Sequence, residues 1–167
     1  MKKAIQKELG LTGDITLRDM YNLTSLNSPS ARITSLEGLQ YAKNLASLNI
    51  SGNEITDFSA LKDLQKLENL NAHPQLVTAE SLKGPVVTVE NLVKDLDGNY
   101  LNPEQIGLRH TKTNKEIYVD VAQLAPNAQQ FSIDLSEEEK GYYMLTFVYK
   151  LKEDTLIQIT YIVQNNN

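Results

Sequence analysis

The sequence predicts an α+β repeat unit followed by an all-β domain, and three observations support this division. Hydrophobic residues of the first half recur at intervals of 22, whereas those of the second half alternate along short segments. The pattern changes at Gly84-Pro85, a dipeptide typical of turns. With 167 residues, 41% of them hydrophobic, the chain is long enough to bury a core in each part.

Residues 23–85 are predicted to form about three coils of 22 residues. The segments 23–42 and 45–64 match at their apolar positions, and a third copy begins at Leu67, then slips by about two residues before Leu82. One coil cannot bury its apolar face alone, so we expect the coils to stack. The middle copy carries the pattern of a leucine-rich repeat, with Leu45, Leu48, Ile50, Asn53 and Ile55 at its defining positions.

Residues 1–22 are predicted to be a helical N-terminal cap on the first coil. Lys3–Leu9 and Leu17–Leu23 have the pattern of two short helices, and the glycines of 10–14 separate them. Thr16 and Asp19 have the spacing of a capping box. Such a cap would cover the apolar end of the stack.

Residues 86–164 are predicted to form a β-sandwich, followed by a polar tail at 165–167. Turn residues separate six alternating segments: Val86–Val93, Ile106–His110, Glu116–Val121, Gln130–Leu135, Tyr142–Leu151 and Thr155–Val163. The run Glu139-Lys140-Gly141-Tyr142-Tyr143 resembles the start of the penultimate strand in immunoglobulin-like domains, where a tyrosine packs at a corner.

Residues 33–42 and 44–57 resemble the repeats of internalin-type bacterial surface proteins, and the helical cap is also similar to that family. The resemblance covers about residues 1–84, and an immunoglobulin-like domain commonly follows such repeats. It implies a short capped leucine-rich-repeat solenoid followed by an Ig-like β-sandwich. It also implies an extracellular, non-enzymatic interaction protein, although the chain opens without the apolar run of a signal peptide.

Composition and motifs predict neither an enzyme nor a cofactor or metal site. A net charge of −5 argues against nucleic-acid binding, and without cysteine there are no disulfides or thiolate ligands. No apolar run is long enough to span a membrane. The only histidines, His73 and His110, fall in different predicted domains, and Asp95–Asn99 fits a hairpin turn better than a calcium loop. The sequence requires no dimer, so we expect a monomer.

The remaining candidate is a binding surface on the concave face of the coils, for a protein or a glycan ligand. The predicted site residues flank the inward positions of each coil: Ser25, Asn27, Ser47, Asn49, Ser51, Asn69, Asn71 and His73. This set lacks the aromatic and arginine side chains that dominate most interfaces. Two alternative functions therefore remain open. The chain could be a structural spacer that presents other domains from the cell wall, or a targeting module of a larger enzyme. Four tyrosines could form a second patch or belong to the core: Tyr142, Tyr143, Tyr149 and Tyr161.

Overall fold

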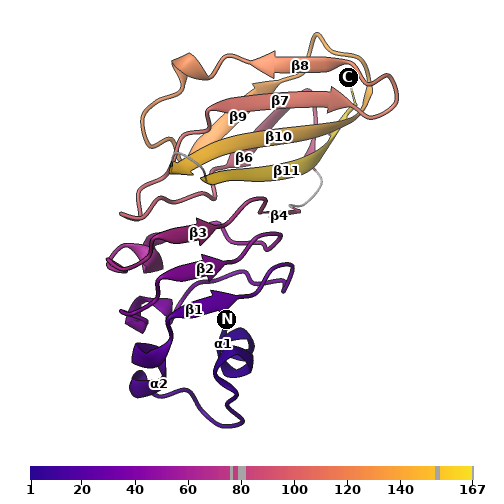
Figure 1. Cartoon of the computed structure of the whole chain (residues 1–167). Coiled ribbons are helices and arrows are strands. Elements are labelled where there is room, and N and C mark those ends of the chain that lie inside the picture. The colour runs from indigo at the N-terminus through magenta and orange to yellow at the C-terminus, as the bar shows by residue number, and fades with distance from the viewer. Residues whose placement is uncertain (76, 79–81, 153–154, 167) are drawn as a thin grey trace.

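The computed structural model describes residues 1–75, 77–78, 82–152 and 155–166. Two short helices and a stack of short parallel strands form one end of the molecule, and a larger sheet of long strands forms the other (Figure 1). Helices α1 (Lys2–Leu9) and α2 (Leu17–Asn22) lie close to their predicted positions. The predicted capping box is present: the Thr16 side chain accepts a hydrogen bond from the Asp19 backbone N–H, and the Asp19 carboxylate accepts one from the Thr16 backbone N–H.

The parallel sheet consists of β1 (Ser25–Asn27), β2 (Ser47–Asn49) and β3 (Asn69–Asn71). Its register follows the 22-residue period, because Leu26 pairs with Leu48 and Leu48 with Leu70. Leu26 and Leu48 point into the core, while their neighbours face outward. Two 3-10 turns, η1 (Leu39–Tyr41) and η2 (Ser59–Leu61), contribute further buried leucines.

Two buried side-chain amides satisfy backbone groups that these short strands leave unpaired. The oxygen of Asn53 accepts hydrogen bonds from the backbone N–H groups of Ala31 and Ile33, each at 3.0 Å, and its nitrogen donates to the Ser28 carbonyl at 2.9 Å. Gln75 takes the same role in the next segment, where its oxygen accepts from the Ile55 N–H at 2.9 Å. Gln75 lies 22 residues after Asn53, at the same position of the repeat.

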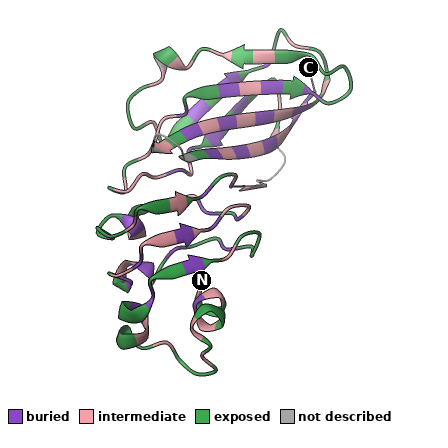
Figure 2. Ribbon diagram, viewed as in Figure 1, coloured by how far each residue is buried: buried purple, intermediate pink, exposed green. Residues whose placement is uncertain are grey.

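The second half forms two antiparallel layers. The larger layer contains β7 (Gln105–His110), β8 (Glu116–Val119), β10 (Gly141–Lys152) and β11 (Thr155–Asn165). The smaller layer is the pair β6 (Val86–Glu90) and β9 (Gln130–Asp134), and a short turn, η3, spans Val121–Gln123. Alternating burial along the long strands is visible in Figure 2. Phe131 of β9 stacks on Phe147 of β10 with ring centroids 5.5 Å apart, so the layers share an aromatic core.

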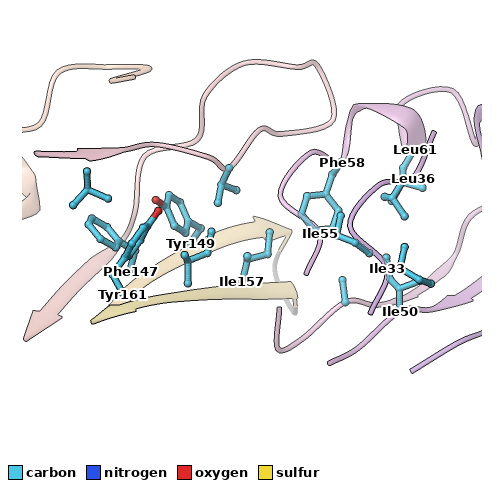
Figure 3. Close-up of a cluster of buried hydrophobic side chains, with 14 of the residues drawn as sticks. Ile33, Leu36, Ile50, Ile55, Phe58, Leu61, Phe147, Tyr149, Ile157 and Tyr161 are labelled. Carbon is cyan, nitrogen blue, oxygen red and sulfur yellow. The ribbon is translucent and has the colours of Figure 1, made fainter. Parts of the chain in front are cut away.

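Two seams join the parallel stack to the antiparallel sheet. Strands β4 (Val77–Thr78) and β5 (Leu82–Lys83) pair in parallel with β11. On the other side, the Phe58 N–H donates to the Lys94 carbonyl, and the Lys94 N–H donates to the Thr56 carbonyl at 2.9 Å. The buried side chains of both halves belong to one cluster, part of which Figure 3 shows from Ile33 and Phe58 to Phe147.

The predicted fold class, a capped leucine-rich-repeat solenoid followed by an Ig-like β-sandwich, is therefore wrong. The chain is mostly β with 14% helix. Among the described residues the parallel sheet stops at three strands of three residues each, and the strands that follow join β11 instead of extending the stack. In the described ranges the smaller layer holds two strands, which is too few for an immunoglobulin-like sheet.

One boundary of the predicted domains also needs correction. Asn165 is the last residue of β11, only 1% exposed, and its side chain donates to the Leu135 carbonyl at 2.9 Å. It belongs to the core of the second half and not to a polar tail. Asn167, also assigned to that tail, lies outside the described residues.

Candidate functional site

The predicted binding residues form two polar rows along the parallel sheet, which we call the polar ladder. One row runs Ser25, Ser47, Asn69 and the other Asn27, Asn49, Asn71, each in the register of the strands. The side chains of β1 and β3 on this face are exposed and those of β2 are half-buried. The 22-residue period therefore places six of the predicted residues side by side on one face.

Hydrogen bonds hold part of the polar ladder in place. The Asn49 Nδ2 donates to the Asn27 Oδ1 at 2.9 Å, and the Asn49 Oδ1 accepts from the Ser51 hydroxyl at 2.9 Å. Ser51 thereby joins the ladder although it lies just beyond β2. Such bonds reduce the rotamer freedom that a ligand would otherwise have to restrict.

His73 differs from the other predicted site residues. It is exposed, but its Nδ1 lies 2.9 Å from the Leu156 carbonyl of β11 and must carry the hydrogen, since a carbonyl only accepts. His73 thus connects the loop after β3 to the antiparallel sheet. This contact lies at the seam and occupies one of the two ring nitrogens.

A polar cleft of about 340 Å³ lies at the second seam, where the sequence predicted no site. Lys94 lies 3.5 Å from the Asp57 carboxylate and over the ring of Tyr100. Partial burial alone would raise the pKa of Asp57. Hydrogen bonds from the Ser59 hydroxyl and backbone N–H, together with the charge of Lys94, outweigh burial and hold this pKa below its usual value. These contacts pair the charges of Asp57 and Lys94 with each other, and Glu90 lines the same cleft.

Of the four tyrosines considered from the sequence, three belong to the core. Tyr143, Tyr149 and Tyr161 are at most 5% exposed, and the Tyr143 hydroxyl donates to the Glu139 carbonyl at 2.8 Å. Burial raises the pKa of Tyr149 far above its usual value. Tyr142 is 52% exposed on the outer side of β10.

Tyr118 was not predicted as a site residue from the sequence. It is 63% exposed at the rim of a hollow of about 300 Å³ on the outer face of the larger sheet. Its neighbour across the strands is Gly107. A lone glycine inside a strand is a signal of close approach by another group, and it could have drawn attention to this position.

Within the described part of the chain, no group of histidine, aspartate or glutamate side chains could hold a metal ion. Among the same residues, no helix is long and apolar enough to cross a membrane.

No protein-family model matches the chain, and no curated protein does. Several solved structures match the chain. A structure of the CBM51-2 and INT domains of Clostridium perfringens ZmpB shares 32% identity with a TM-score of 0.79, covering 97% of this chain and 34% of that chain. A second structure of these domains, with CBM51-2 in complex with GlcNAc, gives 32% identity, the same coverage and a TM-score of 0.77. An internalin, InlF of Listeria monocytogenes, shares 34% identity over 42% of this chain and 22% of its own, with a TM-score of 0.41.

The ZmpB structures and the internalin differ in what they establish. The ZmpB match extends over nearly the whole chain, including the parallel stack and the antiparallel sheet together, and it replaces the predicted fold class. The internalin match is partial, and its TM-score establishes no common fold. The chain spans about a third of the length of each ZmpB structure, so it shares its fold with part of a multidomain bacterial protein.

Proposed function

We propose that this chain is a non-enzymatic, extracellular recognition module of a bacterial surface or secreted protein, and that it binds glycan through the polar ladder. The observation that carries the proposal is the register of β1, β2 and β3, which repeats serine and asparagine side chains on one exposed face. Parallel strands lie about 4.8 Å apart, so this face offers amide and hydroxyl groups at regular intervals.

The chemistry of the ladder suits a ligand rich in hydroxyl groups. Each asparagine amide supplies two donors and an acceptor, and each serine hydroxyl supplies one donor and an acceptor. Of the ladder asparagines, Asn69 and Asn71 of β3 are exposed, whereas a hydrogen bond already joins Asn27 to Asn49. Sugar hydroxyls both donate and accept, as these groups require. The ladder carries no charge, which favours neutral saccharides.

The similarity to ZmpB supports a glycan as the ligand class. One of the two ZmpB structures contains a carbohydrate-binding module in complex with GlcNAc. This chain matches about a third of the chain in that structure, so a place beside other modules, including those of a larger enzyme, is part of the proposal.

A rigid spacer is the second candidate, and the continuous core favours it. Pairing of β4 and β5 with β11, and the bonds between Thr56–Phe58 and Lys94, fix the two halves against each other. A rod of this kind would hold neighbouring domains apart without a ligand of its own.

Binding of the labelled whole chain to immobilised GlcNAc-containing glycans, isolated cell wall and matrix proteins tests the proposal. The Asn49→Lys/Asn71→Glu variant places bulky charges on the ladder without changing the net charge. Its matched control, Glu37→Lys/Lys43→Glu, swaps two exposed charges near η1, away from the strand face.

Saturable binding to glycan or cell wall that the ladder variant reduces at least tenfold, and the control variant leaves unchanged, is the expected result. Binding to matrix protein alone would replace glycan with a protein ligand. Absence of binding to all three surfaces would overturn recognition and favour the spacer.

A further inference from the structure

The outer face of the larger sheet presents one row of side chains from each of its long strands. On β7, Gln105, Gly107 and Arg109 alternate with the buried Ile106 and Leu108. The smaller layer covers the buried side through contacts such as Phe131 on Phe147. In the portion of the chain that the structure describes, the outer side chains of this face stay half-buried or exposed. The face is therefore free to meet a ligand.

Tyr118 and Gly107 make a hollow in this face. They are direct partners across β7 and β8, and one edge of the Tyr118 ring lies 3.7–3.8 Å from the position that a Cβ of residue 107 would occupy. The Tyr118 hydroxyl donates to the Glu116 carboxylate at 3.0 Å. Because Gly107 has no side chain, the surface beside Tyr118 is recessed, and the hydrogen bond to Glu116 restrains the Tyr118 ring. An aromatic surface therefore lies beside an open depression.

Polar groups surround the depression with balanced charge. Arg109 and Glu116 are register partners of opposite charge, and the Arg109 guanidinium lies 3.3 Å from the Met144 sulfur. The rest of the lining combines three uncharged polar side chains, Gln105, Thr146 and Gln158, with the apolar residues Leu108, Met144 and Val148. The hollow thus offers donors and acceptors but no net charge, which excludes strong attraction for an anion or a cation.

We propose that this hollow, around Tyr118 and Gly107, is a binding site for a single neutral pyranose ring of a glycan. The C–H face of a sugar ring would stack on Tyr118, because an exposed aromatic ring supplies an apolar surface with little rotamer freedom to lose. Ring hydroxyls would bond to Arg109, Glu116 and the glutamines. A volume of about 300 Å³ is at the low end for ligand pockets and fits one ring better than a longer chain.

This site is separate from the polar ladder of the proposed function. The ladder lies on β1–β3, whereas the hollow lies on β7, β8, β10 and β11. The two sites share a ligand class but no residue, so an experiment can disprove one site without disproving the other.

A titration of the ¹⁵N-labelled whole chain with cellotriose and chitotriose, followed by NMR, tests the site. Tyr118→Ala removes the aromatic surface, and Tyr118→Phe keeps the ring but loses the bond to Glu116. Tyr142→Ala is the matched control, since Tyr142 is 52% exposed on the same face and lies outside the hollow. Well-dispersed spectra of each variant verify that it folds.

We expect either trisaccharide to shift resonances of β7, β8 and β10, with Tyr118→Ala weakening binding at least tenfold. Tyr118→Phe should bind within about threefold of the unaltered chain, and Tyr142→Ala should bind equally well. Neither sugar shifting these resonances, or equal binding by Tyr118→Ala, would overturn the site. If Asn49→Lys/Asn71→Glu alone abolishes binding, the sugar lies on the polar ladder, and the proposed function survives without the hollow.

Discussion

The two halves of the molecule solve the same problem, the pairing of buried backbone groups, in different ways. In the parallel stack, strands of three residues leave the backbone between them unpaired, and the buried amides of Asn53 and Gln75 bond to it. In the antiparallel sheet, β10 and β11 pair with each other over eleven positions, so their core is aliphatic and aromatic.

Among the described residues of the second half, two buried amides bond to backbone carbonyls that lie outside the strands. The Asn91 side chain donates to the carbonyls of Leu101 and Ala128, and Asn165 donates to that of Leu135. In the stack, one buried amide joins each pair of successive coils, Asn53 between the first and second and Gln75 between the second and third. An unpaired buried backbone group costs about as much as a lost hydrogen bond.

The largest effect that we expect comes from Asn53→Ala in the parallel stack. This change leaves buried N–H and C=O groups of two neighbouring segments without partners, and each costs about 1–3 kcal/mol. We predict a loss of about 3 kcal/mol in the free energy of unfolding, measured by urea denaturation. Asn49→Ala, which removes an outward amide of β2, should cost about 0.5 kcal/mol or less. Equal losses for the two variants would contradict the importance of the buried amide.

A smaller effect is expected from Gly141→Ala in the antiparallel sheet. Gly141 has a φ of +151°, and a Cβ here would lie 2.3 Å from the Nε2 of the buried His110. We predict a loss of about 2 kcal/mol, because the backbone conformation is unfavourable for alanine and the imidazole must move.

The control for Gly141 is Gly13→Ala, since nothing lies within 4 Å of a Cβ at that position. Thermal denaturation should show a Tm within about 2 °C of the unaltered chain for Gly13→Ala and a clear decrease for Gly141→Ala. An unchanged Tm for both would mean that the first residue of β10 relaxes without cost.

The smallest effect concerns the seam between the halves and depends on pH. Because the folded-state pKa of Asp57 lies below its ordinary value, its stabilising contribution is present above about pH 4 and is lost as the pH falls through the folded-state pKa. Asp57→Asn should reduce stability at pH 7 by about 0.5 kcal/mol or less, since the side chain is nearly half exposed. The difference should vanish near pH 2. A constant difference between pH 7 and pH 2 would exclude the carboxylate charge as its cause.

Much of the secondary structure could be predicted from the sequence because it follows local patterns. The alternation over Tyr142–Leu151 predicted β10 to within a residue at each end, and the 22-residue period predicted which serines and asparagines share a face. The fold class could not be predicted. It depends on β4 and β5, and segments of two residues are too short to show any periodicity.

The features that could not be predicted from the sequence depend on contacts between distant segments. Gln75 stands at the repeat position of Asn53, and its side chain reaches the Ile55 N–H, a contact that only the three-dimensional arrangement shows. Exposure of Tyr118 follows from alternation along β8. The hollow beside Tyr118 requires Gly107 as its partner on β7. That pairing is set by the register between β7 and β8, which the sequence of neither strand shows alone.

The pairing of β4 and β5 with β11 also determines the order in which the molecule can assemble. The contact between His73 and Leu156 spans 83 residues of sequence. At about 5–20 residues per second, a ribosome needs roughly 4–17 s to synthesise the intervening chain. During that interval the edge of the nascent parallel stack has no partner strand, so completion of the first half must wait for the synthesis of β11.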